Sequence, residues 1–187
     1  MTLLFRSPRL LALPLLCSLA ASLIPLTAQA CEDHECKVSL PASLKQYLTK
    51  QLPDYQVPTP KMLASAENPH CPPMIKGDFN GDKAKDYALL LVGKNRQPQL
   101  VAALKSRSGW HTALLPTYCT TLDSCYLEKA KPGTYRRTQA IHTAPAHPDD
   151  KATLTHAFDG IISGTSESTG IFYAPIAGKW QHVLIED

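Results

Sequence analysis

One short stretch of the sequence gathers oxygen-bearing side chains at a spacing that suits a metal ion. Counted from Asp78, they occupy positions 1, 3, 5 and 9, and a backbone carbonyl at position 7 completes the set: Asp78, Asn80, Asp82, Asp86 and the carbonyl of Ala84. Ca²⁺ takes roughly six to eight hard oxygen ligands and tolerates irregular geometry, so these residues predict a Ca²⁺ site. The alternative is a hydrogen-bonded turn without metal that leads into a strand.

The sequence around these residues, Gly-Asp-Phe-Asn-Gly-Asp-Lys-Ala-Lys-Asp-Tyr-Ala from Gly77 to Ala88, resembles the calcium loop of FG-GAP and related integrin-type repeats. It is also similar to small exported bacterial proteins of unknown function that carry one such loop. Features shared with those proteins are a helix ending near Leu52-Pro53 and, later in the chain, Asp159-Gly160-Ile161, Glu167-Ser168, Tyr173 and Gly178-Lys179-Trp180. The resemblance implies that a bound ion would be a structural staple rather than a catalytic group.

Two positions depart from the calcium-loop pattern. Lys83 stands where Gly is usual, although the backbone at that position tends to turn through positive φ. Leu89 occupies position 12, so the bidentate Glu of an EF-hand is absent. Three carboxylates that converge without a cation repel one another, so either a metal binds or the loop opens.

The first thirty residues are typical of a secretory signal peptide. Arg6 and Arg9 give the positive start, residues 10–24 form the apolar run, and Ala28-Gln29-Ala30 supplies the small-x-small cleavage pattern. The apolar run is short for a membrane span, and no comparable stretch follows it, so no transmembrane segment is expected. These features predict a periplasmic or secreted protein.

Cleavage after Ala30 would leave Cys31 as the first residue, which keeps two alternatives open: soluble export, or an outer-membrane lipoprotein acylated on Cys31. The other cysteines after the signal are Cys36, Cys71, Cys119 and Cys125. An oxidising compartment favours disulfides among these four, which allow three pairings. The short 119–125 loop suggests a local bridge, which would leave Cys36 with Cys71.

The hydrophobic pattern predicts an α+β fold in one domain over 31–187, with a flexible N-terminus at 31–38. Leucines at helical spacing predict a helix over 40–52, packed on a mainly antiparallel sheet or meander stapled by disulfides. Shorter runs predict strands at 87–92, 99–104, 110–115, 138–143, 153–158, 171–174 and 179–185. The polar stretch 163–170 is expected to be a loop.

Composition excludes some functional classes. The net charge is +3, and loss of Arg6 and Arg9 with the signal lowers it to +1. Charges of both signs are interspersed and aromatic residues are few, so nucleic-acid binding is not expected.

No catalytic set stands out, which favours a periplasmic binding or interaction module over an enzyme, such as an inhibitor or immunity-type protein that acts on another periplasmic protein. The alternative is a metal-assisted hydrolase of a cell-envelope substrate. It would use the loop from Asp78 to Asp86 together with His147 or Glu167.

Overall fold

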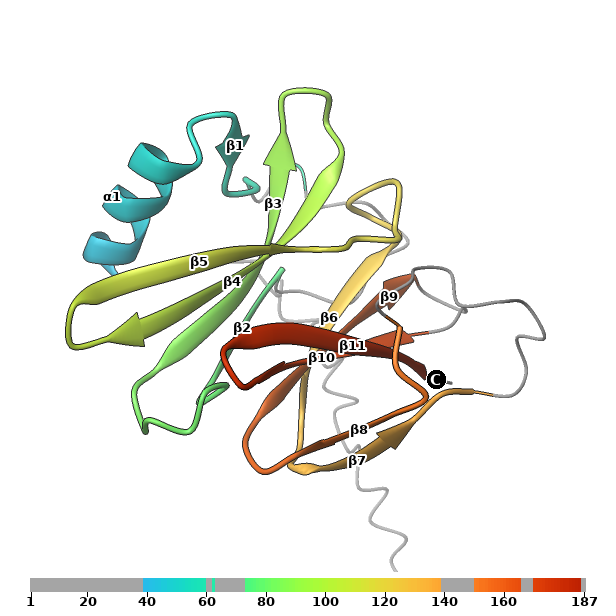
Figure 1. The fold of residues 1–187 in the computed structure, drawn as a ribbon. Helices are drawn as coiled ribbons and strands as arrows, with labels where there is room; N and C mark the ends of the chain where they lie inside the picture. The colour runs from blue at the N-terminus through green and yellow to red at the C-terminus, as the bar shows by residue number, and fades with distance from the viewer. Residues whose placement is uncertain (1–38, 60–61, 63–72, 139–149, 166–169, 186–187) are drawn as a thin grey trace, which may run out of the picture. The chain divides into compact units, whose positions relative to one another are not determined.

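Antiparallel strands make up most of the structure, a computed structural model that describes residues 39–59, 62, 73–138, 150–165 and 170–185 (Figure 1). These residues all fall within one unit of the chain, 34–187. In chain order the elements are α1 (Ala42–Gln51), β1 (Tyr55–Gln56), β2 (Met74–Gly77), β3 (Asp86–Gly93), β4 (Pro98–Ser106), β5 (Gly109–Leu115), β6 (Cys125–Ala130), β7 (Gly133–Arg136), β8 (Thr153–His156), β9 (Gly160–Thr165), β10 (Gly170–Ile176) and β11 (Lys179–Ile185). The mainly antiparallel sheet expected from the sequence is confirmed.

The strands form two larger sheets and a hairpin. The first sheet has the order β1-β3-β4-β5, and β2 also pairs with β3. The second has the order β11-β10-β9-β6, and β7 pairs with β8. Strand β3 is held in register on both sides, since Leu89 lies opposite Met74 of β2 and Val101 of β4.

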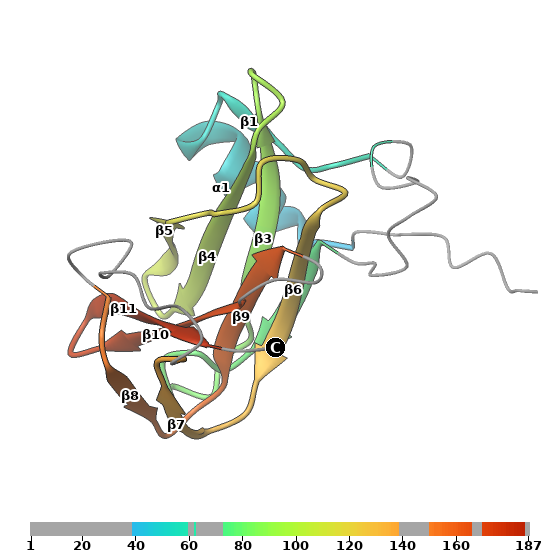
Figure 2. The same ribbon diagram turned by 90° about the vertical axis from the view of Figure 1, so that its right-hand side faces the viewer.

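The first sheet is covered on both faces, which explains why β3 is buried along its whole length. Alternate side chains of a strand point to opposite faces. Leu89 and Leu91 of β3 therefore pack with Leu44 and Leu48 of α1, while Leu90 packs with residues of the second sheet. Figure 2 shows α1 on one side of β3 and β4, with β6 and β9 on the other.

The far face of the second sheet is closed by the β7–β8 hairpin. The ring of Tyr135 stacks on Phe172 of β10 with centroids 3.8 Å apart, and Leu154 belongs to the same cluster. Val183 of β11 is fully buried there. The hairpin is thus the outer layer that keeps this apolar face from solvent.

Helix α1 lies within the segment 40–52 that has helical spacing in the sequence. Pro41 occupies the N-cap position, where the lack of an N–H costs nothing, and Lys45 N–H donates to its carbonyl at 2.9 Å. The helix ends where Leu52 N–H donates to Leu48 O at 2.8 Å, before Pro53. No helix in the described part of the chain is long and apolar enough to cross a membrane.

A disulfide joins Cys119 to Cys125, as the short spacing suggested. Both residues are buried in the cluster between the two sheets, and Cys125 begins β6. The bond therefore fixes the connection that leads from the first sheet to the second. Cys31, Cys36 and Cys71 lie outside the described residues.

Two predictions differ from the structure, namely the loop at 163–170 and the strand at 138–143. The stretch from Ser163 to Thr165, expected to be a polar loop, belongs to β9. Ser163 is buried because its hydroxyl donates to Tyr126 O of β6 at 3.1 Å, which satisfies the polar group inside the sheet. Thr138 is not in a strand, although its N–H donates to Leu184 O, and the rest of the expected 138–143 strand lies outside the described residues.

Candidate functional site

The predicted calcium-loop residues connect β2 to β3 in a tight turn. The backbone takes positive φ at Gly81, 79°, and at Lys83, 64°. Gly81 suits this positive φ, and a Cβ there would also force the half-exposed ring of Phe158 to move. Lys83 adopts the conformation that the calcium-loop pattern assigns to Gly, at a cost of about 1 kcal/mol.

Backbone N–H groups bind the side chains of the loop. Asp78 accepts from Gly81 N at 2.8 Å and from Lys83 N at 3.0 Å, one bond to each carboxylate oxygen. Asn80 accepts from Asp82 N at 3.1 Å, and Asp82 accepts from Ala84 N at 2.7 Å. These bonds curl the first three candidate ligands into one turn.

Asp86 is the buried member of the set and ties the loop to the sheet. Its two carboxylate oxygens accept from Phe79 N at 3.0 Å and from Lys105 N of β4 at 2.7 Å. Burial raises the pKa of Asp86, the two N–H donors lower it, and the charges of Asp82 and Asp78 raise it further. The three carboxylates are therefore close enough to repel one another.

The loop offers the donor chemistry that Ca²⁺ prefers, because each oxygen that accepts one N–H keeps a second lone pair. Asp78, Asn80, Asp82 and the Ala84 carbonyl would hold the ion, and a cation would relieve the repulsion felt by Asp86. Each oxygen of Asp86 also accepts one backbone N–H, but this carboxylate is fully buried and is therefore the least accessible of the candidate ligands. In the described part of the chain, no group of three or more His, Cys, Asp or Glu side chains is arranged to hold a metal. The Ca²⁺ site stays a prediction.

Residues far away in the sequence brace the loop. Asp159 Oδ2 accepts from Asp78 N at 3.1 Å and also lies 3.4 Å from Lys129 Nζ. His156 Nε2 is 3.0 Å from Phe79 O. In the sequence, Asp159 is only one of the features shared with small exported bacterial proteins. No residue pattern near Asp159 or His156 predicts that they contact the loop.

The hydrolase alternative requires His147 or Glu167 beside the loop. Both residues lie outside the described residues, so this arrangement stays a prediction. Comparison of the chain with protein-family models, with curated proteins and with solved structures found no match in any of the three. What the chain can bind or do therefore follows from the geometry of its own residues.

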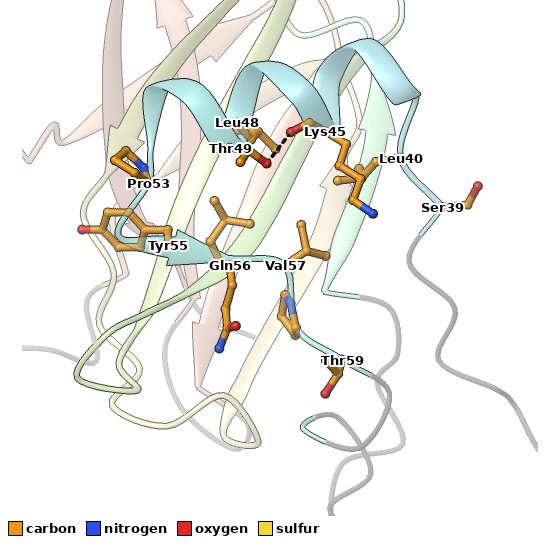
Figure 3. Close-up of a pocket in the computed structure, with 12 residues that line it drawn as sticks. Ser39, Leu40, Lys45, Leu48, Thr49, Pro53, Tyr55, Gln56, Val57 and Thr59 are labelled. Atoms are coloured by element: carbon orange, nitrogen blue, oxygen red, sulfur yellow. Dashed lines mark hydrogen bonds between the residues drawn. The ribbon is translucent and has the colours of Figure 1, made fainter.

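A second candidate site, not anticipated from the sequence, is a groove of about 680 Å³ between α1 and the segment that follows it (Figure 3). We call it the α1 groove. Its walls come from the residues that precede α1, from the middle and last turn of the helix, from β1 and the residues on either side of it, and from one residue of β3: Ser39, Leu40, Lys45, Leu48, Thr49, Pro53, Tyr55, Gln56, Val57, Pro58, Thr59 and Leu91. Ligand sites are commonly hollows of about 300–1,000 Å³ with mainly apolar walls.

The α1 groove is mostly apolar and carries one charged residue. Leu48 and Leu91 form part of its floor and belong to the core cluster beneath α1. Lys45 is exposed at the rim, and its carbonyl accepts the hydroxyl of Thr49 at 3.0 Å. The groove thus combines a fixed apolar floor with a single positive charge.

Proposed function

We propose that the protein is an exported binding module that docks an apolar, carboxylate-bearing segment of another cell-envelope protein in the α1 groove. The groove is the observation that carries this proposal. An inhibitor or immunity-type protein would act in this way, by covering a surface of its target. One Ca²⁺ in the Asp78–Asp86 loop is proposed as a structural support.

The lining of the α1 groove favours this occupant. Burial of the apolar surface of the groove against a partner favours binding by about 25 cal/mol for each Å² removed from water. Of the described residues that line it, Lys45 is the only charged one, so a carboxylate on the partner would complement the rim.

The walls of the groove are held by the core, which limits the entropy lost on binding. Leu44 is fully buried and Leu48 is 4% exposed, so α1 is fixed on the first sheet. On the other wall, Tyr55 of β1 lies opposite Gly93 of β3. Because the site is formed before the partner arrives, less ordering opposes binding.

Photo-crosslinking from the groove tests this proposal. A photoreactive residue at Thr49 or at Gln56, both exposed and lining the groove, should yield one defined adduct in the cells that export the protein. The adduct should map to an apolar segment with an Asp or Glu. The same group at exposed Lys179 of β11 is the matched control and should not capture that protein. Equal capture from all three positions, or crosslinks within the chain alone, would contradict the proposal.

Thermal unfolding with and without Ca²⁺ tests the structural support. A ligand that binds only the native state stabilises it by RT ln(1 + [L]/Kd). For an extracellular-type site with Kd of about 1 mM, about 10 mM Ca²⁺ adds about 1.4 kcal/mol and raises the Tm by about 4 °C. We expect Asp82→Asn to abolish this shift. Asp123→Asn, at an exposed position away from the loop, should retain it. An unchanged Tm in Ca²⁺ would contradict binding of the ion to the loop.

A further inference from the structure

Strand β5 lies at an edge of the first sheet and lacks the features that usually protect an edge. Among the described residues it pairs with β4 and with no other strand, and Figure 2 shows it on the side of β4 away from β3. Exposed strand edges are a template for another strand, so proteins protect them with charged residues, proline or a bulge. The residues of β5, Gly-Trp-His-Thr-Ala-Leu-Leu, include no charged residue and no proline, and its register with β4 has no bulge.

The other strands at sheet edges in the described part of the chain are short, charged or covered. Strands β1, β2, β7 and β8 have four residues or fewer. Strand β6 carries exposed Glu128 and Lys129. Strand β11 is bridged at His182 by Asp150. The seven uncharged residues of β5 are therefore the exception.

The register of β5 with β4 shows which of its backbone groups point outward. Lys105 of β4 lies opposite Trp110, and its N–H donates to Asp86 of β3 at 2.7 Å. In an antiparallel ladder, opposed residues either exchange backbone hydrogen bonds or both turn these groups away from each other. Trp110 therefore turns its N–H and C=O away from β4. The direction alternates along a strand, so Thr112 and Leu114 do the same.

We propose that two copies of the chain pair through β5, with the strands antiparallel and a two-fold axis at Thr112. Thr112 then lies opposite Thr112 of the second copy. Trp110 lies opposite Leu114 of the second copy, and Leu114 lies opposite Trp110. Each of these three pairs joins outward-facing groups and exchanges two N–H···O=C bonds. The first sheets of the two copies become one continuous sheet.

The side chains of β5 favour a second copy as the occupant of this edge. Trp110, Thr112 and Leu114 share one face of the strand. Leu114 is 50% exposed, and the pairing covers it with Trp110 of the second copy, so apolar surface leaves water. Paired threonines and aromatic–aliphatic pairs are favourable across strands, and no like charges oppose each other. The two-fold contact uses both free edges, so association stops at the dimer.

Sedimentation velocity of the purified protein over a concentration series tests the pairing. One strand pair is small beside the roughly 1,200–2,000 Å² of a stable interface, so we expect a dimer with a Kd of about 10–100 μM. Hydrogen exchange followed by NMR locates the contact. At high concentration the amides of Trp110, Thr112 and Leu114 should exchange more slowly, while those of His111 and Ala113, which face β4, should change little. A monomer throughout, association beyond the dimer, or a dimer without this alternation would contradict the proposal.

Opposite charges at position 112 make the test specific for a two-fold pair. Thr112→Lys places two ammonium groups opposite each other at the axis, so the Kd should rise at least about tenfold, and Thr112→Glu should have the same effect. An equal mixture of the two variants should form a mixed dimer, because residue 112 then meets the opposite charge. Recovery in the mixture also verifies that both variants are folded.

Thr155→Lys, at an exposed position of β8, is the matched control and should leave the Kd unchanged. The proposal fails if Thr112→Lys dimerises as the original protein does, or if folded Thr112→Lys and Thr112→Glu do not pair with each other. None of the β5 residues lines the α1 groove, so these outcomes are independent of the test of the proposed function.

Discussion

Replacing Asp150 with alanine is expected to lower the free energy of unfolding by about 3 kcal/mol, because the substitution removes a buried polar contact. Asp150 Oδ1 lies 2.6 Å from His182 Nε2 of β11, and the exposed fractions of the two side chains are 1% and 5%. Loss of the carboxylate removes this contact from a buried imidazole. The neighbouring Lys151 N–H donates to His182 O at 3.0 Å, so a backbone hydrogen bond and the side-chain contact together hold this segment along β11.

A surface ion pair in the same chain provides the control for Asp150. Asp54 pairs with Lys94, but these side chains are 64% and 78% exposed. Solvent and salt screen such a pair, so Asp54→Ala should change stability by less than about 1 kcal/mol. Urea unfolding of both variants makes the comparison. Equal losses for Asp150→Ala and Asp54→Ala would show that the buried pair does not hold the segment.

Replacing Asp86 with alanine is the second large effect, with an expected loss of about 3 kcal/mol. The carboxylate is fully buried and accepts the N–H groups of Phe79 and Lys105. Each buried donor left without an acceptor costs about 1–3 kcal/mol. Asp82→Ala is the control, because Asp82 is exposed and the N–H of Ala84 can turn to water. Urea unfolding that finds the two variants equally stable would contradict this role of Asp86.

The pH dependence of stability provides a second readout on Asp86. Burial raises its pKa in the folded state above the ordinary 3.8, so protonation favours the folded state. The stability contributed by this titration is therefore fully present below pH 3.8 and is lost as the pH rises through the folded-state value. Asn at position 86 does not titrate. When urea unfolding is measured at a series of acidic pH values, the unfolding free energy of Asp86→Asn should therefore lack the pH dependence that Asp86 contributes.

The sequence pattern predicted the central strands because both of their faces are buried. The apolar runs at 87–92 and 99–104 correspond to β3 and β4, and the helical spacing at 40–52 coincides with α1. Strand β6 was missed, because Glu128 and Lys129 face solvent and break the apolar run. No strand was predicted over β9, where the buried Ser163 becomes acceptable only through Tyr126, 37 positions away in the chain.

The candidate sites also contain contacts between distant parts of the chain that the sequence pattern does not predict. The spacing of the loop residues, from Asp78 to Asp86, is local, so the sequence located that turn. The bracing by Asp159 and His156 depends on contacts across about 80 residues, which no local pattern records. The α1 groove depends on the pairing of β1 with β3, and the hydrophobic pattern predicted no strand at 55–56.

The most direct test of the proposed function is the affinity of the purified protein for a peptide spanning the segment captured from the α1 groove. Isothermal titration should give a Kd about tenfold higher for Lys45→Glu, since reversal of the rim charge removes about 1.4 kcal/mol of complementarity. Lys50→Glu makes the same change at another exposed position of α1 and should leave the Kd unchanged. Equal affinities for the original protein and Lys45→Glu, or equal losses in the two variants, would contradict binding in the α1 groove.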